Sequence, residues 1–241
     1  MPPRPGRGGI DDVDDTAHSQ PGPAGAVAAP PGRYGVLLLL LIVTYVMSAL
    51  SRGRLIDGLQ LVLYSGAALL ALRNSSVSRA IVRLVVVVAI AGTAVMVGLS
   101  VSPATGATGT GIANLWTGLV LLFAVVIIVR RVLSFSTVTI QSIYGALSAY
   151  LVVGLMFAAF YAAIYHLGGQ AFFANGQPNS TQTFQYFSFT TLTTLGYGDF
   201  TALHNGARAI AVLEALTGQI FLATLVARLV AAYRGPAGRE R

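Results

Sequence analysis

The chain has 241 residues, of which 55% are hydrophobic and 10% charged, and its mean hydropathy is +0.73. Such a composition excludes an ordinary soluble domain and leaves no room for a separate enzyme module. The net charge of +7 comes entirely from arginine, and no basic patch is interleaved with aromatic residues, which argues against nucleic-acid binding. The absence of cysteine excludes disulfides and thiolate metal sites.

Residues 1–33 are rich in proline, contain the run DDVDD and lack an apolar face, which predicts a disordered tail. Six apolar segments follow, each near the roughly 20 residues that a membrane-spanning helix needs. They cover residues 34–50, 55–72, 80–101, 112–129, 140–166 and 207–233.

Arginines predict how these segments are oriented. They flank the second and fourth connections and the C-terminus, so we expect these ends in the cytoplasm. Only Arg52 and Arg54, in the first connection, argue against this orientation. The sequence therefore predicts an all-α integral membrane protein of the plasma membrane, with six transmembrane helices and both termini cytoplasmic.

The connection between the last two segments is not uniformly polar. A glycine- and asparagine-rich loop is followed by TQTFQYFSFTTLTTLGYGDF, in which residues 183–193 are apolar and aromatic. This run is only about half the length of a span, which predicts a re-entrant helix. Non-helical backbone at membrane depth is tolerated only where it is buried in protein or lines a watery path.

The stretch after this helix suits a dehydrated cation. If the chain returns in extended form, glycines at Gly196 and Gly198 allow positive φ angles, so that successive carbonyls can face one side. Leu195 and Tyr197 would then point outward into packing. A simple surface turn is the alternative for GYGD, but a turn needs no half-length apolar helix before it.

Residues 194–199, TLGYGD, resemble the signature filter of the potassium channel superfamily, with leucine where valine is commonest. The pore-helix aromatic pair, its closing threonines and the inner helix at residues 206–228 also match, so the resemblance covers residues 140–233. It implies a homotetramer whose permeant ion is potassium, with no cofactor. The K⁺-coordinating groups would come from Thr194, Leu195, Gly196, Tyr197 and Gly198. The residues that support the filter would be Asp199, Tyr186, Phe187, Thr190 and Thr193.

The last apolar segment contains two candidate gating residues. Gly218 matches the hinge glycine of this family, and close packing against a neighbouring helix is the alternative. Glu214 is the only acidic residue inside a span apart from Asp57 near an end. We expect it behind the filter, hydrogen-bonded to Thr190 or a neighbouring backbone group, with cavity lining or a merely structural hydrogen bond as alternatives.

The apolar segments and the resemblance together divide the chain into predicted domains. Residues 1–33 would be a cytoplasmic tail, 34–131 a four-helix membrane domain, 132–141 a linker, 142–233 the pore domain and 234–241 a short cytoplasmic tail. The fourth segment carries arginine only at its inner end, Arg130 and Arg131, so it is not a conventional voltage sensor. The inner arginines suit anionic lipid head groups or simple topological anchoring.

These features predict a channel that conducts potassium passively and is not conventionally voltage gated. A potassium transporter subunit is one alternative, although such transporters usually carry weaker filters in several non-identical repeats. A non-conducting membrane scaffold or regulatory subunit is another. No HExxH, GxSxG or phosphate-binding loop is found, so an enzyme is not expected.

Overall fold

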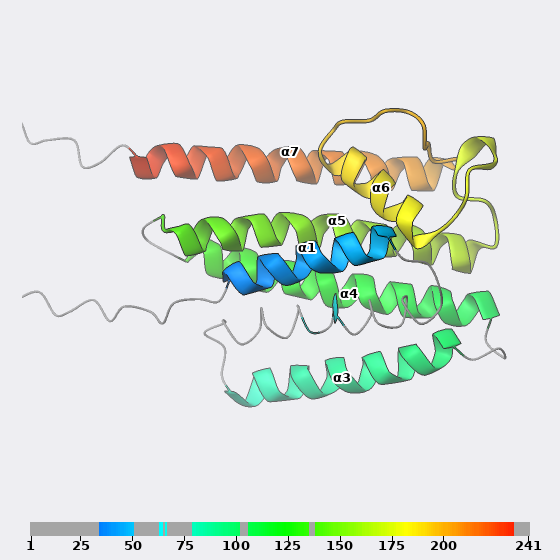
Figure 1. Cartoon of the computed structure of the whole chain (residues 1–241), viewed down its shortest axis with the longest axis horizontal. Helices are drawn as coiled ribbons and strands as arrows, with labels where there is room; N and C mark the ends of the chain where they lie inside the picture. The colour runs from blue at the N-terminus through cyan, green and yellow to red at the C-terminus, as the bar shows by residue number, and fades with distance from the viewer. Residues whose placement is uncertain are drawn as a thin grey trace, which may run out of the picture. The chain divides into compact units, whose positions relative to one another are not determined.

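The computed structural model describes residues 34–50, 63–64, 66, 79–101, 106–134 and 138–233, all within one compact unit, Gly32–Arg241. The helices shown in Figure 1 are α1 (Tyr34–Leu50), α3 (Arg79–Val101), α4 (Gly106–Leu133), α5 (Ile140–Gly168), α6 (Thr181–Leu192) and α7 (Asn205–Tyr233), with the 3-10 helix η1 (Ala174–Gly176). Among these residues the only β pairing is an isolated bridge between Phe173 and Ala202. The predicted all-α fold is confirmed.

Three of the described helices are long and apolar enough to cross a membrane: Gly106–Leu133, Ile140–Gly168 and Asn205–Ala231. Helix α1 has 17 residues, and residues Ile90–Leu99 of α3 form a further, shorter apolar stretch. These helices support a membrane protein. Both predicted tails and most of the segment predicted at 55–72 lie outside the described residues, so the count of six spans stays a prediction.

Helix α4 is longer than the sequence indicated. It begins at Gly106, inside the predicted third connection, and ends at Leu133, while α5 begins at Ile140 behind a capping box formed by Thr139 and Ser142. The connection between them is therefore shorter than the linker predicted at residues 132–141. Glycine and threonine have low helix propensity, but close packing of this first part of α4 against α5 outweighs that preference.

Helices α4 and α5 pack as an antiparallel pair through glycines. A Cβ added at Gly118 would lie 2.4 Å from Cε1 of Phe160, and one added at Gly145 would lie 2.8 Å from Cγ2 of Val132. Small residues let two helix backbones approach closely, which is common where no hydrophobic effect drives association. In Figure 1, α5 lies between α4 and α7.

Helix α6 is a half-length helix of 12 residues that begins at a capping box, in which Ser180 and Thr183 exchange hydrogen bonds. Its last carbonyl oxygen, that of Leu192, accepts a hydrogen bond from the Tyr150 hydroxyl over 3.2 Å and lies against Gly218, near the middle of α7. Residues 193–204 then run back to the start of α7 (Figure 1). The half-length helix and the returning segment that the sequence predicts are therefore both present, whereas their depth in a membrane stays a prediction.

Candidate functional site

The segment after α6 has an unusual backbone. Thr194, Gly196 and Gly198 have positive φ angles of 56°, 52° and 79°. Left-handed residues at every second position allow successive peptide groups to face the same way, with N–H groups on one side and C=O groups on the other. The positive φ predicted for both glycines is confirmed, and that of Thr194 was not predicted because residues with a Cβ rarely adopt it.

Local hydrogen bonds hold Thr194 in this conformation. Its hydroxyl donates to the Thr193 carbonyl oxygen over 2.7 Å and accepts from Nε2 of Gln219 over 3.0 Å. A left-handed residue with a Cβ costs about 1–2 kcal/mol, and these two bonds offset that cost. Gln219 was missed as a site residue, although a glutamine within the apolar α7 was a signal in the sequence.

The base of the segment is anchored on the last turn of α6. The Thr190 carbonyl oxygen accepts from the amides of Leu195 and Gly196, over 2.8 and 3.1 Å. The Thr190 hydroxyl donates to the Phe187 carbonyl oxygen over 3.0 Å, and both side chains are buried. Thr190 and Phe187, predicted as supports, therefore lie where they can fix the start of the segment.

The far end of the segment is held by Asp199 and its neighbours. The Asp199 carbonyl oxygen accepts from Nε2 of Gln177 over 3.2 Å. A hydrogen bond with the Asp199 carboxylate raises the pKa of the Tyr186 hydroxyl above its usual value, and the Tyr186 ring packs edge-on against Phe200. Tyr186 and Asp199, both predicted supports, are thus brought together.

The loop before α6 also supports the returning chain. The amide of Ala174 donates to the Thr201 carbonyl oxygen over 2.9 Å, and the amide of Leu203 donates to the Phe172 carbonyl oxygen over 2.8 Å. A buried hydrophobic cluster lies beside this loop, and its aromatic rings pack against one another. Its aromatic residues are Tyr161, Phe172, Phe173, Phe184 and Phe187. Phe172 and Phe173 were missed from the sequence because their loop was described by its glycines and asparagines, and adjacent phenylalanines were the available signal.

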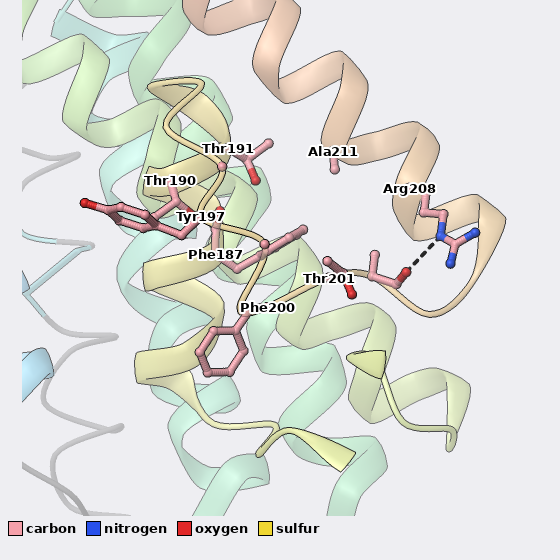
Figure 2. A pocket seen from close by; sticks show the side chains of 11 residues that line it. Phe187, Thr190, Thr191, Tyr197, Phe200, Thr201, Arg208 and Ala211 are labelled. Atoms are coloured by element: carbon pink, nitrogen blue, oxygen red, sulfur yellow. Dashed lines mark hydrogen bonds between the residues drawn. The ribbon is translucent and has the colours of Figure 1, made fainter. Parts of the chain in front are cut away.

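The segment itself is uncovered within one chain. Residues 193–199 are all exposed, with Leu195 55% and Tyr197 67% exposed, so the packing predicted for these two side chains is not found within the described chain. Behind the segment lies a cavity of about 280 Å³, lined from α6 by Phe187 and Thr190 and from α7 by Arg208 and Ala211. Figure 2 shows this hollow, with Nε of Arg208 donating to the Ala202 carbonyl oxygen over 2.9 Å.

A comparison with known families finds a match in this region. Residues 149–234 match the family model described as an ion channel. This part of the chain is similar to an ion channel, and we call it the pore domain. The match covers most of α5 together with α6, the segment with alternating φ and α7, and it confirms the superfamily recognised from the sequence. No curated protein and no solved structure matches the chain.

Within the pore domain, Gly218 is a close-contact position. A Cβ added there would lie 2.1 Å from the Leu192 carbonyl oxygen, and α7 runs as a continuous helix through this residue. Only glycine lets α7 approach the end of α6 this closely. The observation supports the packing role that the sequence left open, while the hinge role stays a prediction.

Glu214 joins all three helices of the pore domain. Its side chain is fully buried; Oε2 accepts from the Tyr161 hydroxyl of α5 over 2.5 Å, and Oε1 is hydrogen-bonded to the Ser188 hydroxyl of α6. The predicted partner, Thr190, is wrong, because Ser188 is the α6 residue whose side chain faces α7 at this level. Full burial also argues against the cavity-lining alternative.

The hydrogen-bond pattern indicates a proton on Glu214. The Ser188 hydroxyl lies 2.6 Å from the Gly154 carbonyl oxygen as well as next to the carboxyl group. A hydroxyl has one proton and cannot donate to both acceptors. Both contacts are satisfied if Ser188 donates to Gly154 and the Glu214 carboxyl donates to Ser188.

We therefore predict that Glu214→Gln preserves the thermal stability of the purified protein, since an amide supplies one donor and one acceptor at the same places. Glu214→Ala should lower it, because the buried Tyr161 hydroxyl loses its acceptor, at a cost of about 1–3 kcal/mol before any cavity is counted. Thermal unfolding in detergent compares the two. Equal losses in both variants would mean that the carboxyl is ionised.

Proposed function

We propose that the chain is a potassium-selective channel that conducts K⁺ passively across the plasma membrane as a homotetramer. The observation that carries the proposal is the alternation of left-handed residues at Thr194, Gly196 and Gly198 at the end of a half-length helix. Oxygens facing one side of such a segment can replace the hydration shell of K⁺. The coordinating groups would belong to Thr194 through Gly198, which we call the filter.

The direction of α6 supports cation conduction. Its C-terminal end leads directly into the filter, and the last turn carries the negative end of the helix dipole. The Thr193 hydroxyl and amide both bond to the Phe189 carbonyl oxygen, which keeps this turn intact up to the filter. A cation at the base of the filter is therefore favoured by every subunit.

Exposure of the filter supports assembly. Its backbone groups are polar and cannot face lipid, yet one chain leaves residues 193–199 exposed, with a cavity behind them. One chain supplies one wall of oxygens, and a closed ring of this kind uses four. Adjacent subunits would then cover Leu195 and Tyr197, which are the exposed apolar side chains of the filter.

The inner end of α7 supports the proposed topology. Arg228 donates through Nη1 to the Val132 carbonyl oxygen over 2.6 Å and through Nη2 to that of Leu133 over 3.3 Å. These are terminal carbonyls of α4, so the ends of α4 and α7 lie on one side, as expected if both are cytoplasmic. The same side would meet anionic lipids through the arginines there.

We predict that Arg228→Gln raises the open probability, because spreading the inner ends of α7 would have to separate Arg228 from α4. The lost charge-assisted bonds are worth about 1.5–3 kcal/mol, a shift of about tenfold or more in the equilibrium between closed and open states. Single-channel recording measures the change. Arg130→Gln is the matched control, since it removes an exposed arginine from the same end of α4; equal effects in both variants would assign the result to surface charge.

Flux into liposomes tests the proposed function. Purified protein should carry K⁺ or Rb⁺ down a gradient without another energy source, reject Na⁺ and be blocked by Ba²⁺. A transporter subunit would need a coupling ion or a partner, and a scaffold would carry no flux.

Two further measurements test selectivity and assembly. Reversal potentials in mixed K⁺ and Na⁺ measure selectivity, and mass measurement of the detergent-solubilised particle should give four chains. A monomer or dimer, or equal permeation of Na⁺, would overturn the proposal.

A further inference from the structure

A buried hydrogen-bond network joins the end of α1 to the middle of α6. The Ser48 hydroxyl donates to Oε1 of Gln185 over 2.8 Å, and Nε2 of Gln185 donates to the Tyr64 hydroxyl over 2.9 Å. Ser48, Gln185 and Tyr64 are 0%, 3% and 7% exposed. A second glutamine of α6, Gln182, donates through Nε2 to the Ser48 carbonyl oxygen over 3.1 Å.

This network fixes how α6 is rotated about its axis. A buried amide is tolerated only when its oxygen and nitrogen both find partners, and those of Gln185 come from two different parts of the chain. Rotation of α6 would separate Gln185 from both. Tyr45 of α1 also packs edge-on against Phe189, with ring centroids 5.0 Å apart, so the contact continues for another turn along α6.

The same rotation sets the base of the filter. Gln185 lies five residues before Thr190, which at 1.5 Å per residue is about 7.5 Å along the helix axis. The Thr190 carbonyl oxygen binds the amides of Leu195 and Gly196. Because a helix turns as a rigid element, a side chain that fixes the rotation at Gln185 also fixes the direction of this carbonyl.

We propose that Ser48, Tyr64 and Gln185 are positioning residues of the filter. They fix α6 from the side of the N-terminal helices and thereby hold the filter in its conducting geometry, without touching the ion. The inference rests on the proposed function. It gives α1 and Tyr64 a role in ion selectivity, because they hold α6 and so the filter in place.

The test uses the full-length protein in planar bilayers, with Ser48→Ala and Tyr64→Phe, each of which removes one hydroxyl without adding bulk. We expect the K⁺/Na⁺ permeability ratio to fall about threefold to tenfold, the factor that one ordinary hydrogen bond is worth. Ser48→Thr keeps the donor and should keep the ratio. Thr44→Ala is the matched control, because Thr44 is also buried in α1 but donates within its own helix, to the Leu40 carbonyl oxygen over 2.7 Å.

Selective wild-type protein with unchanged ratios in Ser48→Ala and Tyr64→Phe would overturn the inference alone. So would an equal fall in Thr44→Ala, because a loss of packing would then explain both. Wild-type protein that passes no K⁺ would overturn the proposed function and the inference with it. Gln185→Asn, which withdraws the amide without removing it, is the second variant and should lower the ratio in the same way.

Discussion

Replacing Gly196 by alanine should abolish selective potassium conduction while leaving the helices intact. Gly196 has a φ of 52°, where a residue with a Cβ costs about 1–2 kcal/mol. No atom lies within 4 Å of the place that its Cβ would take, so the penalty within one subunit is backbone strain and not a collision. In a ring of four chains the strain sums to about 4–8 kcal/mol, which is enough to drive the segment out of its alternating conformation.

Gly169 provides the matched control for this strain. It ends α5 with a φ of 66° and likewise has nothing within 4 Å of the place that an added Cβ would take, but it lies outside the filter. Gly169→Ala should lower thermal stability by a similar amount per chain and keep the reversal potential of the wild type. Rubidium flux and reversal potentials of both variants decide the matter: selective flux through Gly196→Ala would contradict a conducting role for this backbone.

The half-length helix and the filter backbone could be predicted from the sequence because their signals are local. A short apolar run indicates a helix that cannot span, and α6 extends over Thr181–Leu192 where residues 183–193 were expected. Glycine at alternate positions indicates a backbone that other residues avoid, and Gly196 and Gly198 do have positive φ. Both inferences need only neighbouring residues.

The contacts that support the filter could not be predicted because they depend on residues far apart in the chain. Ser48 and Gln185 are 137 positions apart, and neither local sequence indicates that the other residue is its partner. Glu214 was singled out as a polar residue in an apolar span, yet Ser188 was not paired with it, since the pairing follows from the crossing of α6 and α7. The same criterion, a polar residue within an apolar segment, would have singled out Gln185.

Gly218→Ala should disrupt the pore domain by forcing α7 away from α6. The added Cβ would lie 2.1 Å from the Leu192 carbonyl oxygen, which is backbone and cannot turn aside. Overpacking of this kind costs about 1–3 kcal/mol per chain, and the displaced carbonyl is the one that accepts from the Tyr150 hydroxyl at the base of the filter. We expect a lower thermal stability of the assembly together with a reduced K⁺/Na⁺ permeability ratio.

The hinge role of Gly218 gives a different result in the same variant. If flexibility alone matters, alanine stiffens α7, and open probability falls while selectivity is unchanged. Adding Thr217→Gly separates the two roles, because it restores a flexible residue beside position 218 without restoring the space against Leu192. Rescue by Thr217→Gly would support the hinge, whereas a double variant as impaired as Gly218→Ala would support close packing.

Gly206→Ala controls for the substitution itself. Gly206 lies in the first turn of the same helix, and nothing lies within 4 Å of a Cβ there, so this variant changes helix propensity without changing a contact. Selectivity should match the wild type, and the melting temperature should not fall, because alanine favours the helix more than glycine does. Since α7 meets the end of α6 at Gly218, a loss confined to Gly218→Ala would mean that the inner helix sets the geometry of the filter base through direct contact.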